Sequence, residues 1–267
     1  MHRRLVSSNL RIQVSATAQL VFSVAVSAEH EPAQERLSLT VDGDPIDVEE
    51  LLAPNGGRLH RAVNVPVGQL IVDYAATIDG QAPPAPLQGI DEVLYTRPSR
   101  YCDSDRLAAL SGAHFDGLEG SALVSAVRAW VHDKIAYRSG SSRGVDGALD
   151  TYIARAGVCR DFSHLAIAFL RARNVAARFV SVYAPGLKPM DFHAVTEVWL
   201  DGAWQLFDAT GLAPRQAMVR ICTGRDAADT AFMTTLGGRT QLESVRVEAQ
   251  IDGDLPSDDG LGLSLLS

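Results

Sequence analysis

The sequence predicts an α+β protein in which an all-β region precedes a layer of helices packed on an antiparallel sheet. Three observations support this fold class. Apolar residues alternate at every second position through most of the first ninety residues. They shift to helical spacing between about 121 and 171, and β-branched and aromatic runs return from 177. Strands followed by helices and further strands are typical of α+β folds.

The N-terminal region contains several segments with the alternation of half-buried strands. One long alternating segment covers residues 10–26, and shorter ones cover 37–41, 59–65 and 70–78. A proline-rich stretch at 82–86 then ends the pattern. We therefore expect residues 1–90 to form a small all-β sandwich or barrel domain.

The rest of the chain divides into three further parts. Residues 91–120 are expected to be a connector, 121–250 a core of helices and strands, and 251–267 a flexible acidic tail. Ser121 is a candidate cap for the first core helix. Further helices are expected at 146–155 and from Cys159 to about Asn174, and strands at 177–184, 192–200, 203–209, 217–223 and 242–250.

Cys159 lies where a Gly-Val turn runs into a helical pattern. Phe162, Leu165 and Phe169 belong to one apolar face of that helix. A cysteine at a helix start meets unpaired backbone N–H groups and the positive end of the helix dipole, which favour the nucleophilic thiolate. The alternative is a small buried residue that packs the start of the helix.

A hairpin signal follows at Asp201-Gly202, between two runs rich in β-branched and aromatic residues. With a two-residue loop, Val195 opposes Asp208, so His193 and Asp208 are expected on one face within reach of a hydrogen bond. The alternative is a solvated His and Asp on an edge hairpin. Together with Cys159, the pair has the nucleophile, base and orienting group of covalent catalysis.

These motifs resemble the transglutaminase-like cysteine peptidase superfamily, in particular a bacterial branch with an N-terminal β domain. The resemblance is carried by Gly-Val-Cys-Arg-Asp-Phe-Ser-His-Leu, Ala-Ala-Arg-Phe-Val-Ser-Val-Tyr, Asp-Phe-His-Ala and Trp-Gln-Leu-Phe-Asp-Ala-Thr. It covers roughly residues 150–215 and implies a papain-like core with Cys159 as nucleophile, His193 as general base and acid, and Asp208 as orienting carboxylate. Many relatives have Asp-Pro-Thr where this chain has Asp-Ala-Thr.

Secondary candidates for the site are the aromatic residues Trp199, Trp204 and Tyr183. The two tryptophans are expected to face each other across the hairpin, on the face of His193 and Asp208, where one could line a substrate cleft. Tyr183 is a candidate cleft residue through the resemblance alone. His164 follows Cys159 by about 140° around a helix and is expected to pack inside the core.

Composition restricts the remaining functions. The net charge is −8, and residues 97–250 are close to neutral without a basic stripe, which argues against a nucleic-acid partner. Three cysteines without close pairing favour a reducing, cytoplasmic compartment. The spacing of Cys and His predicts no metal site, and no cofactor motif is apparent. The alternating N-terminus argues against a signal peptide, and no apolar run is long enough to span a membrane.

The sequence therefore predicts a thiol-dependent hydrolase, a peptidase or amidase, that cleaves an amide bond of a peptide or protein through a Cys159 thioester. Two alternatives stay open: transglutaminase-type acyl transfer to an amine, and a non-catalytic binding module that retained the fold. The choice between water and amine depends on how the cleft excludes water from the thioester.

Overall fold

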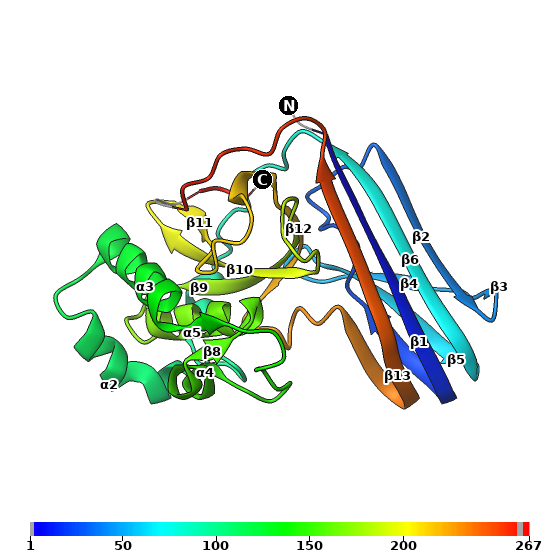
Figure 1. The fold of residues 1–267 in the computed structure, drawn as a ribbon, viewed down its shortest axis with the longest axis horizontal. Helices are drawn as coiled ribbons and strands as arrows, with labels where there is room; N and C mark the ends of the chain where they lie inside the picture. Colours follow the sequence, from blue (N-terminus) through cyan, green and yellow to red (C-terminus); the bar gives the residue numbers. More distant parts are fainter. Residues whose placement is uncertain (1–2, 261–263, 267) are drawn as a thin grey trace.

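A computed structural model describes residues 3–260 and 264–266. The fold is the predicted combination of an all-β region with a helical layer on an antiparallel sheet (Figure 1). In Figure 1 the helices lie at the left and the large sheet at the right, with the smaller sheet between them. The site described below lies in the smaller sheet and the helix packed on it.

The N-terminal region is one antiparallel sheet whose inward-facing positions are the alternating apolar residues of the sequence. Within the described residues it has seven strands, with β1 at its centre. Leu10, Ile12 and Val14 of β1 are fully buried, as their alternation predicts. The strands from this region are β1 (Arg3–Phe22), β2 (Gln34–Val41), β3 (Asp44–Pro45), β4 (Glu49–Leu52), β5 (Arg58–Val65) and β6 (Gly68–Asp79).

The seventh strand of this sheet comes from the far end of the chain. Strand β13 (Met233–Ile251) runs antiparallel to almost the whole length of β1, from Arg4 opposite Ile251 to Phe22 opposite Met233. Most of this segment was expected in the core at 121–250, whereas the structure places it in the N-terminal sheet. Periodicity identifies a strand but not its partner, because hydrogen-bond pairing is non-local.

The core consists of five helices and a four-stranded antiparallel sheet in the order β11-β10-β9-β12 within the described residues. Helix α5 packs on β9 and β10, and α2, α3 and α4 cover its outer side. The core elements are α1 (Asp91–Thr96), α2 (Ser104–His114), α3 (Gly120–Lys134), β7 (Ala136–Tyr137), α4 (Ala148–Ala154), β8 (Ala156–Gly157), α5 (Cys159–Arg171), β9 (Ala177–Tyr183), β10 (His193–Leu200), β11 (Ala203–Phe207), a 3₁₀ turn (Arg215–Ala217) and β12 (Val219–Gly224).

Two local expectations need adjustment. The segment at 91–120, expected as a connector, contains α1 and α2, and α2 packs directly on α5. Helix α3 begins at Gly120, and Glu119 rather than Ser121 occupies its N-cap position. Helix α5 ends at Arg171, shortly before the expected end near Asn174, and Asn174 adopts a left-handed conformation with φ of 58°.

The described part of the predicted acidic tail is largely exposed, but it makes specific contacts with the core. The Asp258 carboxylate accepts hydrogen bonds from the Arg215 guanidinium, with the closest N–O distance 2.8 Å. Ser264 forms an antiparallel bridge with Leu206, and Leu266 is buried. Composition could not indicate these contacts because they join residues that are distant in the chain; Arg215 lies 43 positions before Asp258. Residues 261–263 and 267 of the predicted tail lie outside the described residues.

Candidate active site

Cys159 is the first residue of helix α5, as the sequence predicts. The Asp161 carboxylate accepts a hydrogen bond of 2.9 Å from the backbone N–H of Val158 and so caps the helix start. Gly157 is required here because a Cβ at that position would come within 2.6 Å of the Asp161 Cβ. The thiol is half-buried, whereas Cys102 and Cys222 are buried.

The predicted hairpin register is confirmed. Leu200 pairs with Ala203 and Trp199 with Trp204. Asp201 and Gly202 have φ of 53° and 80°, the left-handed pair that a two-residue hairpin turn requires. The hairpin brings the beginning of β10 next to the residues that follow β11.

His193 begins β10 and Asp208 follows β11, and the two side chains are in contact. The distance from His193 Nε2 to Asp208 Oδ2 is 2.8 Å, and both side chains are almost completely buried. The second carboxylate oxygen, Oδ1, accepts hydrogen bonds of 2.7 Å from the N–H and the hydroxyl of Thr210. Both oxygens of the Asp208 carboxylate therefore accept hydrogen bonds, Oδ1 from Thr210 and Oδ2 from His193.

The charges of this pair are strongly coupled. Burial alone would lower the pKa of His193, but the charge and hydrogen bond of Asp208, with a smaller contribution from Cys159, raise it to about 10. Burial would raise the pKa of Asp208, but His193 and Thr210 outweigh it and lower that pKa. The arrangement favours an imidazolium beside a carboxylate at neutral pH.

The other ring nitrogen of His193, Nδ1, has no such partner among the described residues. Nδ1 is buried and hydrogen-bonds to no other described residue, while Nε2 is occupied by Asp208. The hydroxyl of Tyr137 also lies beside Cys159, because β7 pairs with β8 immediately before α5. Burial and the neighbouring thiol raise the pKa of Tyr137 to about 12, so the hydroxyl keeps its proton at neutral pH.

Cys159 and His193 open into one cavity of about 420 Å³. Its size is at the lower end of the range typical for small-molecule sites. Most of its other lining is apolar and includes Phe179, Phe192 and Phe232.

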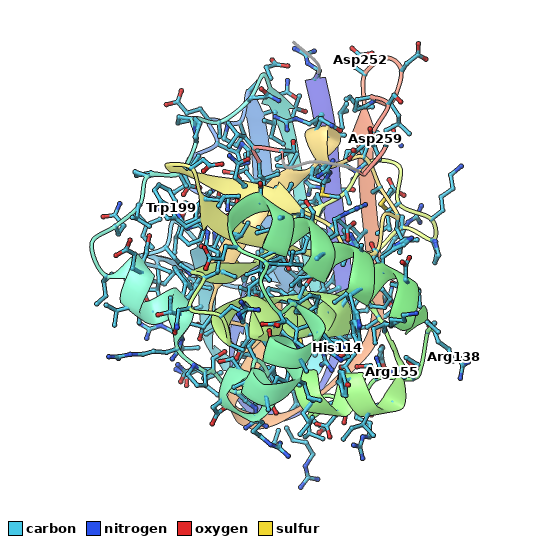
Figure 2. The ribbon with its side chains drawn as sticks, turned by 90° about the vertical axis from the view of Figure 1, so that its left-hand side faces the viewer. His114, Arg138, Arg155, Trp199, Asp252 and Asp259 are labelled. Atoms are coloured by element: carbon cyan, nitrogen blue, oxygen red, sulfur yellow. The ribbon has the colours of Figure 1, made fainter. Side chains whose placement is uncertain are left out.

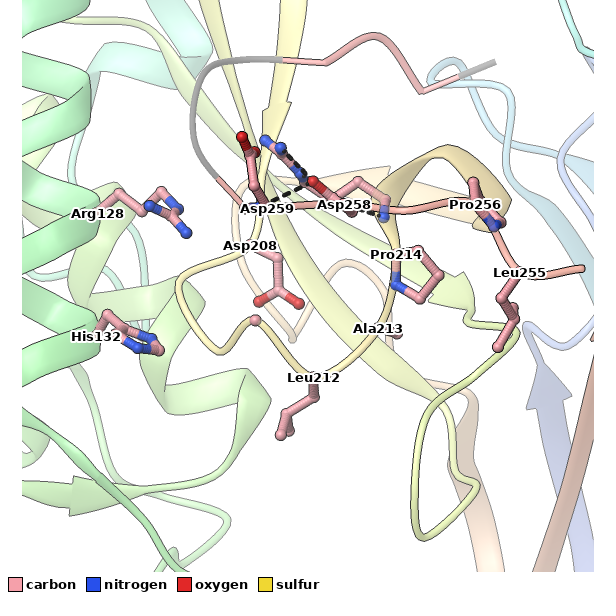
Figure 3. Close-up of a pocket in the computed structure, with 13 residues that line it drawn as sticks. Arg128, His132, Asp208, Leu212, Ala213, Pro214, Leu255, Pro256, Asp258 and Asp259 are labelled. Atoms are coloured by element: carbon pink, nitrogen blue, oxygen red, sulfur yellow. Dashed lines mark hydrogen bonds and ion pairs between the residues drawn. The ribbon is translucent and has the colours of Figure 1, made fainter.

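A second cavity of about 400 Å³ lies on the other side of Asp208 (Figure 3). Figure 3 shows Arg128 and His132 of α3 on one side of Asp208 and the segment containing Asp258 on the other. His132 Nδ1 lies 2.9 Å from the carbonyl oxygen of Ala209 and so supports the loop that follows Asp208. The hydrogen bond between His193 and Asp208 thus lies between two cavities.

The three predicted substrate-binding aromatics lie elsewhere, and this expectation is corrected. Trp199 and Trp204 do face each other, with ring centroids 5.5 Å apart, but neither lines the cavity of Cys159. Trp204 packs edge-on against Tyr95, and Figure 2 shows Trp199 near the edge of the molecule. Trp199 lies six positions along the strand from His193, a distance of about 20 Å, so a shared face does not bring them together.

Tyr183 is fully buried between the core and the large sheet. Its hydroxyl donates a hydrogen bond of 2.7 Å to the carbonyl of Val24 and lies 3.1 Å from the Ser8 hydroxyl. Burial raises its pKa. Tyr183 therefore joins the two sheets instead of facing substrate.

His164 is an interior residue, as expected. It stacks on Tyr101 and its Nε2 accepts a hydrogen bond of 3.1 Å from the N–H of Ala227. Sequence reasoning missed Thr210 and Phe232 at the site. The Asp-Ala-Thr spacing offered a signal for Thr210, because a Thr two residues after an Asp can return a hydrogen bond to its carboxylate. No comparable sequence signal indicated that Phe232 would lie at the site.

The described residues contain no group of three or more His, Cys, Asp and Glu side chains that could hold a metal ion. Over those same residues, no helix is long and apolar enough to cross a membrane.

A helix-start cysteine beside a buried His–Asp pair on an antiparallel sheet is the arrangement expected of a transglutaminase-like core. Comparison with known proteins agrees with this expectation. The family model for the transglutaminase-like superfamily matches residues 116–209, which include the whole predicted triad.

Relatives extend the match beyond this segment. A crystal structure from Cytophaga hutchinsonii, described as a "Putative Cysteine Protease", superposes with a TM-score of 0.88 at 33% identity, covering 98% of this chain and 96% of that one. An uncharacterised protein of Mycobacterium tuberculosis strain H37Rv is 37% identical over an alignment of 114 residues, and the match covers 37% of this chain and 36% of that protein. One from Mycobacterium leprae is 27% identical over 173 residues, covering 60% of this chain and 61% of that protein.

This chain belongs to the transglutaminase-like superfamily. The chain spans only about a third of the length of the Mycobacterium tuberculosis protein, but nearly all of the Cytophaga hutchinsonii chain. The β region and β13 are therefore part of the similarity to a solved structure, and not only the helical core.

Proposed function

We propose that this protein is a thiol-dependent hydrolase that cleaves an amide bond of a peptide or protein, with Cys159, His193 and Asp208 as its catalytic residues. One observation carries the proposal: His193 is bonded to Asp208 through Nε2 while its buried Nδ1 is left for Cys159, beside a cavity large enough for a substrate. This is the relation between base, orienting group and nucleophile that covalent catalysis requires.

The proposed reaction has two steps. In the first, the Cys159 thiolate adds to the carbonyl carbon, and the tetrahedral intermediate collapses as Nδ1–H of His193 protonates the leaving nitrogen. An amine departs and a thioester remains on Cys159. In the second, neutral His193 takes a proton from water, the hydroxide adds to the thioester, and the acid product leaves as the thiolate is restored.

The developing oxyanion needs hydrogen-bond donors. The backbone N–H of Cys159, at the unpaired start of α5, is one such donor. The protonated hydroxyl of Tyr137 lies beside the same N–H and thiol and could provide a second. Asp208 acts through His193, because it fixes the ring and stabilises the imidazolium formed in the reaction.

Hydrolysis is proposed over amine transfer because water needs no dedicated binding site. The reference experiment incubates the protein with N-acetyl-phenylalanine amide, with and without a primary amine such as cadaverine, and identifies the products by mass. Mainly free acid would support the hydrolase, and mainly amine conjugate would support a transglutaminase. Cys159→Ala is the control, and product formation by this variant would rule out the thioester route.

A binding module that retained the fold is the remaining alternative, and the absence of any product across a broad set of amides would favour it. For the compartment, the three unpaired cysteines support a reducing, cytoplasmic environment. As partners we propose a peptide or protein substrate, without nucleic acid and without a membrane.

A further inference from the structure

One wall of the cavity at Cys159 is supplied by the segment that enters the large β-sheet. Phe232 and Met233 line the cavity, and Met233 is the first residue of β13. The carbonyl of Phe232 accepts a hydrogen bond of 3.0 Å from the N–H of Ser23, just after β1. Met233 pairs with Phe22. The position of this wall is therefore fixed by the N-terminal sheet.

A row of aromatic rings connects the sheet core to this wall. Tyr74 stacks on Tyr183 with centroids 6.3 Å apart, and Tyr183 packs against Phe192 at 5.6 Å. Phe192 in turn stacks on Phe232 at 5.3 Å and an interplanar angle of 24°. Phe192 is the residue before His193. The row thus leads from the buried sheet to the catalytic histidine, and its last two members face the cavity.

The charges around the cavity do not favour an acidic ligand. The guanidinium of Arg160 is already bonded to Ser142, to the carbonyl of Arg143 and to Asp161 at 2.7, 2.6 and 3.1 Å. The remaining charged side chains of the lining are the His193 imidazolium, which is paired with Asp208 at 2.8 Å, and the carboxylate of Asp191, whose pKa burial raises. A further carboxylate in the cavity would meet the like charge of Asp191, because both cations of the lining, Arg160 and His193, already have carboxylate partners.

We propose that this cavity is a specificity subsite for a large apolar side chain, aromatic in preference, on the residue that contributes the carbonyl of the cleaved bond. The inference rests on the proposed function. It assigns the occupant to the acyl residue because that residue stays attached to Cys159 in the thioester. It also gives the N-terminal sheet a role, since the sheet positions Phe232 and Met233.

The test uses reagents that carry only the acyl side. N-acetyl chloromethyl ketones of Phe, Leu, Ala and Glu alkylate a nucleophilic thiol without turnover, and peptide mass mapping reports the rate at Cys159. The Phe reagent is expected to react about 10–100-fold faster than the Ala reagent, because a hydrophobic pocket discriminates by about that amount. The Glu reagent is expected to be the slowest. Iodoacetamide, which has no side chain, measures the reactivity of the thiol itself.

Variants test the wall directly. Phe232→Ala is expected to reduce the Phe-to-Ala rate ratio about tenfold, and Met233→Lys to raise the rate of the Glu reagent relative to the Phe reagent. Trp199→Ala removes a half-buried aromatic residue far from the cavity and is expected to keep the ratio.

The outcomes separate the two proposals. Cys159 that reacts with iodoacetamide but equally with all four ketones would overturn the subsite and leave the proposed function standing. Cys159 that resists iodoacetamide would overturn both. A Phe preference that survives both Phe232→Ala and Met233→Lys would show that the selectivity comes from another part of the molecule and would overturn the assignment to this wall.

Discussion

Replacement of Asp208 by Asn is the perturbation that most sharply tests how the site is organised. In the structure both carboxylate oxygens accept N–H donors, Oδ2 from His193 and Oδ1 from Thr210. An Asn side chain has one acceptor oxygen and one NH₂ group. It must therefore direct a donor at a donor on one side, and either the orientation of His193 or the turn at Thr210 is lost.

The loss of charge adds a second effect whose size follows from the pKa of His193. That pKa is about 10 with the carboxylate present. Without it, burial remains, and we expect a value near or below the ordinary 6.5. The protonated fraction would then fall to about a tenth at pH 7.5 and about a hundredth at pH 8.5. With disturbed orientation in addition, we expect an activity loss of about 10²–10⁴-fold near neutral pH.

The assay is kcat/KM for hydrolysis of an N-acetyl-phenylalanyl coumarin amide between pH 6 and pH 10.5. The wild type should lose activity only as the pH rises through about 10, where His193 loses its proton. The basic limb of Asp208→Asn should move to lower pH by several units. Asp201→Asn, the same change at the exposed turn of the hairpin, is the matched control. Near-normal activity with an unmoved basic limb in Asp208→Asn would refute the reasoning.

Three further predictions address reactivity and stability. A limiting dose of iodoacetamide at pH 7 should label Cys159 before Cys102 and Cys222, because burial raises the pKa of Cys102 to about 12 and that of Cys222 to about 11. Faster labelling of Cys102 or Cys222 would contradict the assignment of Cys159 as the nucleophile. Glu197→Gln should lower the free energy of unfolding in urea by about 3–5 kcal/mol, since it leaves two buried arginines without their charge partner. The two arginines outweigh burial and lower the pKa of Glu197 to about 2. The contribution of Glu197 to the free energy of unfolding should therefore be present above about pH 4.5 and be lost as the pH falls towards 2. A free energy of unfolding that stays constant through this range would argue against such a contribution. Asp258→Ala removes the ion pair with Arg215 and should therefore speed proteolytic cleavage of the C-terminal segment without unfolding the core. An unchanged cleavage rate would show that this ion pair does not hold the segment.

The sequence predicted what depends on local pattern. Alternation identified β1 and β6, and helical spacing together with a Gly turn located the start of α5 at Cys159. The Asp-Gly turn fixed the register of the hairpin, from which the contact between His193 and Asp208 followed. These features are predictable because each depends on neighbours a few residues away in the chain.

What the sequence could not supply depends on distant partners. Nothing in the alternation of 242–250 indicates that β13 joins β1, because both sheets accept a strand of the same pattern. Phe232 entered the site only through that pairing. Trp199 was assigned to the cleft by its face alone, although its distance along the strand takes it out of reach.

The central claim is that Cys159 forms a covalent thioester with an amide substrate. Intact-mass spectrometry after rapid acid quench, with N-acetyl-phenylalanine amide or its activated 4-nitrophenyl ester, tests it most directly. The expected result is an adduct with the mass of the acyl group on Cys159, located by peptide mapping, that decays in water and is missing from Cys159→Ala. An adduct on another residue, or product formation without Cys159, would contradict it.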